Sequence, residues 1–244
     1  MQLRLSAFIA GTLLVFAVFS SAEATDDATL EVVGKYLDAT KVQQEALRGS
    51  QMEVSIDARL PRLEKQGRWR ALRIVPKLGK ITYKALGFSG DTTVKQEVIA
   101  RYLSLESDQH DANSIAVTPT NYKFRLKAKL TQGDRRIDIF ELNPKKKKVG
   151  LFKGELWLDA DSGMPVKISG QWVKSPSVFV KKIEFVQEFE LQNGVSLPSH
   201  IESTVDTRVA GRAELSINFT NFTHLEDDAS GDVLNEIAEE TAGH

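Results

Sequence analysis

The residues of this chain that could carry catalysis or bind a metal are four histidines and a short acidic stretch, and neither set has a suitable spacing. The histidines stand at positions 110, 200, 224 and 244, too far apart for the H-E-x-x-H pair of a zinc enzyme. Asp159 and Asp161 resemble the start of a calcium loop, but that loop needs a glutamate at its twelfth position, where Gly170 stands. We therefore interpret residues 159–163 as an acidic hairpin turn, and we expect no metal and no cofactor.

Nucleophilic and phosphate-binding motifs are also missing from the sequence. Residues 87–90 read Gly-Phe-Ser-Gly, one position short of the G-x-S-x-G turn that exposes a catalytic serine. The chain has no cysteine, which excludes disulfides, thiolate metal sites and a cysteine nucleophile. It has no glycine-rich phosphate loop. We therefore expect a protein that is not an enzyme.

The charge is balanced overall but unevenly spread. With 41% hydrophobic and 27% charged residues and a net charge of −1, the chain of 244 residues can form a globular domain with a sizeable core. Residues 145–148 are four lysines, interpreted as a solvated hairpin tip, with contact to anionic lipid or an acidic partner as the alternative. Residues 226–244 contain acids but no lysine or arginine, and we interpret them as a solvated acidic tail, with shielding of a basic surface as the alternative.

The first residues have the pattern of a secretory signal peptide. Arg4 supplies a positive start, residues 8–19 are apolar, and Ala22-Glu23-Ala24 fits the small-x-small cleavage pattern. The apolar run is shorter than the 20 or so residues of a membrane-spanning helix. We therefore expect a signal peptide over residues 1–24, a domain over 25–225 and the acidic tail over 226–244, with an uncleaved anchor as the alternative. An exported protein is not expected to bind nucleic acid.

Residues 122–222 are predicted to form seven strands of one antiparallel sheet. Tyr122, Phe124, Leu126, Ala128 and Leu130 alternate with cations, which predicts a strand with one apolar and one charged face. Turn signals such as Asn193-Gly194 separate further apolar segments. These segments are residues 137–142, 152–158, 166–173, 183–191, 195–209 and 215–222.

The first half of the chain combines two predicted helices with shorter strands. A helix is predicted over residues 28–48 and strands over 52–60, 68–75 and 80–88. A second helix over 93–106 is expected to begin at a T-x-x-Q capping box at Thr93, and a polar surface loop over 107–120 should follow it. Few helices against a mostly antiparallel sheet predict an α+β fold. About ten strands should curl into an incomplete β-barrel, with the helices covering its concave apolar face.

Three stretches in the second half resemble bacterial outer-membrane lipoprotein-sorting proteins of the LolA-like superfamily. They are residues 139–146 (Ile-Phe-Glu-Leu-Asn-Pro-Lys-Lys), 152–159 (Phe-Lys-Gly-Glu-Leu-Trp-Leu-Asp) and 162–168 (Ser-Gly-Met-Pro-Val-Lys-Ile). The order of the predicted elements is also similar to that family. The chain departs from it over residues 79–88, which lack the family's Tyr-x-Pro step. No matching motif surrounds Arg59, so the functional arginine of the family is not carried over.

The resemblance implies a periplasmic carrier whose apolar cavity receives the acyl chains of a lipid or lipoprotein on their way to the outer membrane. It implies an inner-membrane transporter and an outer-membrane acceptor as partners, and we expect a monomer. The alternative is an envelope sensor or binding module of the same fold that recognises a partner protein instead of lipid.

The candidate cavity residues come from the apolar faces of the predicted strands and from the second helix, which is expected to act as a lid. The alternative is that these residues only form the core. They are Val54, Ile56, Val94, Val98, Tyr102, Phe124, Leu126, Ile183, Phe185 and Phe189.

Overall fold

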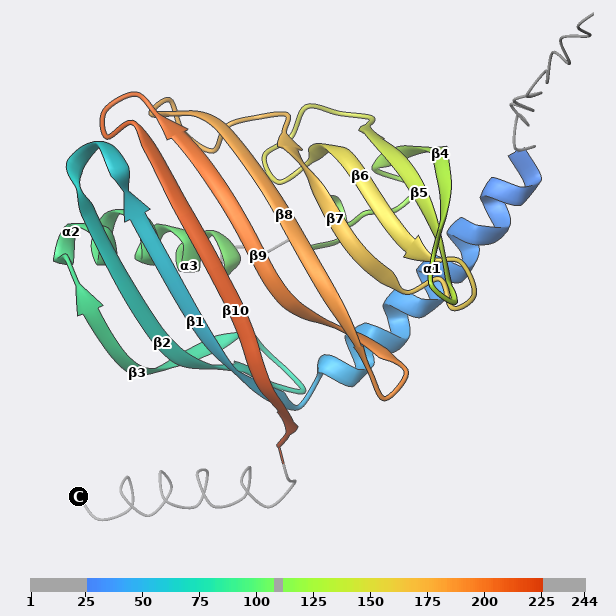
Figure 1. The fold of residues 1–244 in the computed structure, drawn as a ribbon, viewed down its shortest axis with the longest axis horizontal. Helices are drawn as coiled ribbons and strands as arrows, with labels where there is room; N and C mark the ends of the chain where they lie inside the picture. The colour runs from blue at the N-terminus through green and yellow to red at the C-terminus, as the bar shows by residue number, and fades with distance from the viewer. Residues whose placement is uncertain (1–25, 108–111, 226–244) are drawn as a thin grey trace, which may run out of the picture.

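The computed structural model describes residues 26–107 and 112–225, so the predicted signal peptide and the whole of the predicted acidic tail lie outside the described residues. The described chain forms one antiparallel sheet of ten strands in the order β3-β2-β1-β10-β9-β8-β7-β6-β5-β4. The predicted α+β class and open, barrel-like sheet are confirmed, because β3 and β4 are its two edges and do not pair (Figure 1). The strands are β1 (Ser50–Leu60), β2 (Lys65–Val75), β3 (Thr82–Gly90), β4 (Tyr122–Gln132), β5 (Arg135–Pro144), β6 (Phe152–Asp159), β7 (Pro165–Trp172), β8 (Val180–Gln192), β9 (Val195–Thr207) and β10 (Arg212–His224).

Two helical segments pack on the same side of the sheet. The first is α1 (Asp26–Leu47), close to its predicted bounds. The second is continuous from α2 (Thr92–Val94) through the π-helical η2 (Lys95–Ile99) to α3 (Ala100–Ser107). Short 3₁₀ turns are η1 (Pro61–Leu63) and η3 (Ala112–Ser114). The helices lie behind opposite halves of the sheet in Figure 1.

The N-cap of the second helix lies two residues earlier than the sequence predicts. Asp91, not Thr93, is the N-cap, and its carboxylate accepts a hydrogen bond from the Thr93 N–H at 2.7 Å. The Asp91 hydrogen bonds with Thr93 lower the pKa of this carboxyl. An aspartate satisfies the exposed amides of a first turn as well as a threonine does, which is why the capping-box prediction was wrong by two residues.

A π-turn in this helix changes which side chains face the sheet. The Ala100 N–H donates to the Lys95 carbonyl, five residues back instead of four. The wider turn brings both Val98 and Ile99 inward, and both are buried. A regular helix of 3.6 residues per turn would not bury two neighbours equally, so the sequence pattern pointed to Val98 alone.

A β-bulge between Leu126 and Ala128 interrupts the predicted alternation of β4. Leu126 pairs with Phe140, but Ala128 then pairs with Ile139. Two residues of β4 therefore cover one step of β5, which shifts every later side chain by one position. Leu130 is exposed as a result, and the prediction of one uninterrupted apolar face from Tyr122 to Leu130 was wrong.

Glycines allow the sheet to curve where β6 and β7 pair. Gly154 lies directly opposite Gly170, and Gly170 lies opposite Phe185 of β8. A Cβ atom on Gly154 would stand 2.5 Å from the Gly170 Cα, and one on Gly170 would meet the Phe152 ring at 2.5 Å. Only residues without a side chain permit this approach, and the Phe152 and Phe185 rings then meet edge to face at 5.0 Å between centroids.

Candidate functional site

The apolar interior between the sheet and the helices is divided into two packed clusters. The first core lies between β1, β2, β10 and the second helix. Its centre is Val54 and Ile56 of β1, Ile217 of β10, and Val94 and Ile99 of the helix, all nearly or fully buried. Because these side chains already contact one another, they form a closed core in this structure.

The second core lies between α1 and strands β4 to β6. Tyr36 of α1 and Tyr122 of β4 are both buried in it, next to Phe140 and Phe152. Burial raises the pKa of both Tyr36 and Tyr122 to about 12. The Tyr122 hydroxyl accepts a hydrogen bond from the Phe152 N–H at 3.2 Å, so this buried oxygen is satisfied.

The loop before β4 contributes to this second core. Ile115 and Val117 are half-buried and pack against it. The prediction of a purely surface loop over residues 107–120 was therefore wrong for its second half, while residues 108–111 lie outside the described residues.

The boundary between the two cores runs along the pairing of β8 with β9. Phe185 of β8 packs against the second core, whereas Ile201 and Val205 of β9 pack against the first. Ile183 lies directly opposite Val205, and Phe185 directly opposite Ser203. We call Ile183, Phe185, Ile201 and Val205 the seam. Three of these four side chains are only half-buried, so the seam is not fully closed.

The two helices are attached to the sheet to different extents. The Gln43 side chain of α1 donates a hydrogen bond to the Ser196 carbonyl of β9, and Gly163 packs directly on the Lys35 backbone. The second helix is anchored at its start by buried Val94, Val98 and Ile99. In α3, among residues 100–104, whose side chains the structure describes, Tyr102 and Leu103 are half-buried and pack against the first core.

The structure distributes the predicted cavity residues over both cores. Val54, Ile56, Val94, Val98 and Tyr102 contribute to the first core, and Phe124, Leu126 and Phe185 pack against the second. Ile183 is buried at the seam, and Phe189 follows a bulge at Glu188/Phe189 and is half-buried. Their role as ligand contacts stays a prediction.

Sequence reasoning missed Ile99, Leu103, Ile201 and Val205. The last two occupy alternate positions of a strand that was predicted, so their shared face could have been inferred from period two. Ile99 could not, because its burial depends on the π-turn.

The charged outer face of β4 is neutralised by neighbouring strands. Arg125 pairs with Glu141 of β5 through its Nε at 2.8 Å, and Lys127 pairs with Glu155 of β6. The predicted cationic face is therefore a ladder of exposed ion pairs, each of small energetic value.

Two kinds of feature are absent from the part of the chain that the structure describes. No group of three or more histidine, cysteine, aspartate or glutamate side chains in residues 26–107 and 112–225 could hold a metal ion. Within the same residues, no helix has the length and apolar character needed to cross a membrane.

No protein family model and no curated protein matches this chain. Several solved structures are similar to it. A LolA superfamily protein from Nitrosomonas europaea is similar with 14% identity and a TM-score of 0.38, over 79% of this chain and 94% of that one. A DUF1329 family protein from Desulfovibrio piger has 12% identity and a TM-score of 0.42, over 82% and 98% of the two chains.

A domain named for outer membrane lipoprotein sorting, from Vibrio parahaemolyticus, has 11% identity and a TM-score of 0.37, over 80% of this chain and 96% of that one. The predicted resemblance is thus confirmed in a limited sense: structures of that kind are among those similar to this chain. At these scores the likeness carries no argument about function.

Proposed function

We propose that this chain is an exported, periplasmic carrier that binds the acyl chains of a lipid or lipoprotein at the seam and moves them toward the outer membrane. The observation that supports this proposal most is the division of the interior. Two packed cores meet along a half-buried apolar seam, and each core has its own helix. A ligand could enter between the cores without dismantling either one.

Acyl chains need such a site because their exposure to water is costly. Each methylene transferred from water to an apolar environment gains about 0.8 kcal/mol, so a chain of roughly fifteen methylenes gains on the order of 12 kcal/mol. Part of this gain would offset the cost of opening the interior. The opening must therefore break few contacts in the protein.

α3 is the element that we expect to move. Tyr102 and Leu103 are its half-buried apolar contacts with the first core, whereas the preceding turns are fixed by Val94, Val98 and Ile99. The π-turn between these halves is a point at which the backbone hydrogen bonds can rearrange. Movement of α3 would free the edge of the first core at which Tyr102 and Leu103 pack, while Val94, Val98 and Ile99 stay in place.

The test is to measure lipid bound to the exported protein by native mass spectrometry. Ile201→Asp places a carboxylate on the seam, and Ser55→Asp places one on the opposite face of the sheet, next to Arg70 of β2. The wild type and Ser55→Asp should retain a lipid-sized mass, and Ile201→Asp should lose it. A cooperative thermal unfolding transition of each variant shows that it is folded. Absence of lipid from the wild type, or equal retention in both variants, would contradict the proposal.

A second candidate function is recognition of a partner protein, and the exposed edge strand β3 favours it. Most residues of β3 are exposed, and its outer side carries no strand partner in the described part of the chain. Such an edge can accept an extended segment of another protein as an eleventh strand. A co-exported polypeptide whose binding is abolished by Gly87→Pro, in a protein free of lipid, would support this alternative.

A further inference from the structure

Several loops of the sheet meet at one of its ends and carry exposed apolar side chains. The loop between β7 and β8 exposes Val178 by 76% and Phe179 by 61%, and the β9–β10 turn exposes Val209 by 74%. The β1–β2 turn adds Leu63, which is 45% exposed. We call these four side chains the apolar tips. Their loops lie along the upper end of the sheet in Figure 1.

Direct contacts link these loops. The Arg208 N–H donates to the Phe179 carbonyl at 2.9 Å, and the Arg208 Nε donates to the Val178 carbonyl at 2.8 Å. The Arg62 side chain packs against Gly211 of the β9–β10 turn. The backbone that carries Val178 and Phe179 is thus held in place, and their exposure is a property of the folded loop.

Cations surround the apolar tips at the same end of the sheet. Arg62, Lys174, Lys181 and Arg208 stand in or next to these loops, and none forms an ion pair within residues 26–107 and 112–225. The β5–β6 connection, whose Leu151 carbonyl accepts from the Val173 N–H, brings lysines 145–148 to this end as well. We call these cations the basic rim. Glu64, Asp91 and Asp206 are the acids nearby, and Asp91 and Asp206 are paired with Lys65 and Arg212.

The opposite end of the sheet carries charges of both signs. Its turns between β4 and β5 and between β6 and β7 carry Asp134 and Asp161, and the β2–β3 turn carries Lys77 and Lys80. Leu78 stands there in the β2–β3 turn at 90% exposure, and Leu130 of β4 and Leu191 of β8 are exposed near the same end.

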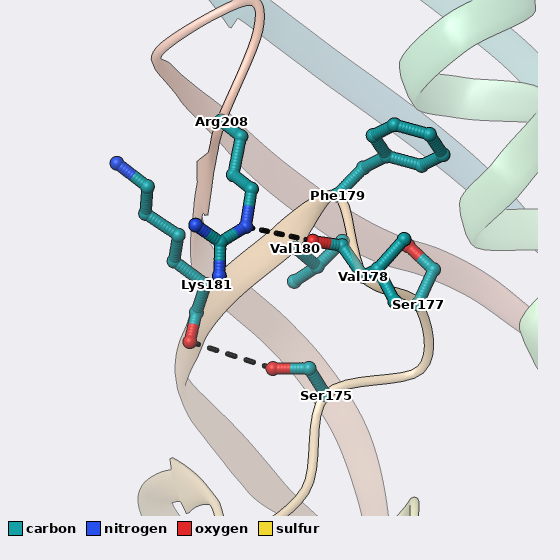
Figure 2. Close-up of a pocket in the computed structure, with 7 residues that line it drawn as sticks. All are labelled: Ser175, Ser177, Val178, Phe179, Val180, Lys181 and Arg208. Carbon is teal, nitrogen blue, oxygen red and sulfur yellow. Dashed lines mark hydrogen bonds between the residues drawn. The ribbon is translucent and has the colours of Figure 1, made fainter.

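Figure 2 shows how one of these loops presents both kinds of side chain. The Lys181 and Arg208 side chains extend to one side of the loop and the Phe179 ring to the other. They border a hollow of about 570 Å³ together with Ser175, Ser177 and Val178. An apolar ring beside flanking cations matches the two layers of a lipid surface, with acyl chains below and phosphates above.

We infer that the apolar tips and the basic rim dock this protein onto the surface of an anionic lipid bilayer. The geometry favours a bilayer over a protein partner. The tips stand on three different loops and alternate with the cations of the basic rim, so they form no continuous apolar patch of the kind found at the centre of a protein interface. A bilayer needs no complementary shape, since each tip inserts by itself and each cation adds attraction to anionic headgroups.

One end of the seam lies near the same end of the sheet. Ile183 and Val205 form a pair that lies close to the pair of Val180 and Thr207, beyond which Phe179 and Arg208 follow. Docking at this end would therefore bring the proposed acyl site next to the bilayer. The docking itself does not depend on the proposed carrier function, because it requires no acyl ligand.

The experiment is flotation of the full chain with vesicles of phosphatidylglycerol and phosphatidylcholine, and with vesicles of phosphatidylcholine alone. The variants are Val178→Ser with Phe179→Ser, and Lys146→Gln with Lys147→Gln. Leu78→Ser is the matched control, since it removes an exposed apolar side chain at the other end. All proteins share the same chain ends, so any contribution of residues outside the described part is equal among them.

We expect the wild type and Leu78→Ser to bind the anionic vesicles, and both double variants to bind at least about tenfold more weakly. Added salt should weaken binding of the wild type, because it screens the basic rim. Equal binding by the double variants and the control would overturn the inference. So would failure of the wild type to prefer anionic vesicles, which would leave a protein partner as the occupant of this end. Acyl binding is measured separately in solution, so failure of the docking inference can be told apart from failure of the proposed carrier function.

Discussion

Replacing Val98 with aspartate tests which part of the second helix is fixed to the sheet. Val98 is 8% exposed and belongs to the first core with Val94 and Ile99. Loss of a buried valine costs about 1.5–3 kcal/mol. The new carboxyl group must also be neutralised in this apolar site, which costs about 4 kcal/mol at pH 7 if its ordinary pKa is near 3.9. The sum approaches the whole stability of a typical domain, which is about 5–15 kcal/mol.

Leu103→Asp should behave differently, although it lies only about one turn further along the helix. Leu103 is half-buried at the end of the first core, so a carboxylate there can rotate into water. We expect it to lower the free energy of unfolding by about 1–2 kcal/mol while it weakens acyl binding. Ser104→Asp, at an exposed neighbour in α3, controls for the effect of aspartate on the helix itself.

Thermal melting and acyl binding measured on these three variants decide the matter. At this chain length, 1 kcal/mol corresponds to about 2–4 °C in Tm, so Val98→Asp should lower Tm by at least about 10 °C and Leu103→Asp by a few degrees. Equal losses of stability at positions 98 and 103 would show that α3 is as firmly packed as the preceding turns. The reasoning would also be refuted if a folded Leu103→Asp protein bound acyl chains like the wild type.

Three further predictions concern the two buried tyrosines, the N-cap of the second helix and the C-terminal tail. Because Tyr36 and Tyr122 have pKa values of about 12 in the fold and an ordinary value near 10, the unfolded chain releases these protons first, and the free energy of unfolding should fall as pH rises from about 10 to 12. Denaturant melts in this pH range, repeated with Tyr122→Phe to remove one of the two groups, would show it; a flat profile in the wild type would contradict it. Asp91→Ala removes an N-cap and should cost about 1 kcal/mol in urea unfolding, with Asp91→Asn close to the wild type. Deletion of residues 227–244 should shift Tm by no more than a few degrees, and a larger loss would show that the tail docks on the domain.

The fold was largely predictable from the sequence because its signals are local. Alternation and turn residues mark the strands, and Asn193-Gly194 forms the predicted tight turn between β8 and β9. Structural features that depend on the neighbouring strand were not predictable from the sequence. The bulge after Leu126 exists only in its pairing with Phe140 and Ile139 of β5, and a pattern along one strand does not contain that partner.

The candidate site was predictable in composition but not in arrangement. The sequence identified Val54, Val98 and Phe185 as inward-facing, and each lies in or against one of the two cores. It assigned them to one cavity, because the apolar face of a sheet does not reveal where each helix packs on it. Period two could have placed Ile201 and Val205 on the inward face, but their position at the boundary between the cores follows from how the helices pack and was not predictable.

The most direct test of the proposed carrier site uses the absence of cysteine from the chain. Ser203→Cys places a single thiol on the seam side of β9, opposite Phe185, and Ser55→Cys places one on the other face of the sheet. The measurement is the rate at which each thiol reacts with a maleimide, with and without a saturating long-chain fatty acid. The carrier proposal predicts that the fatty acid slows the reaction at position 203 by at least about tenfold and leaves position 55 unchanged, since a bound chain excludes solvent from its site. An unchanged rate at position 203, or equal slowing at both positions, would contradict it.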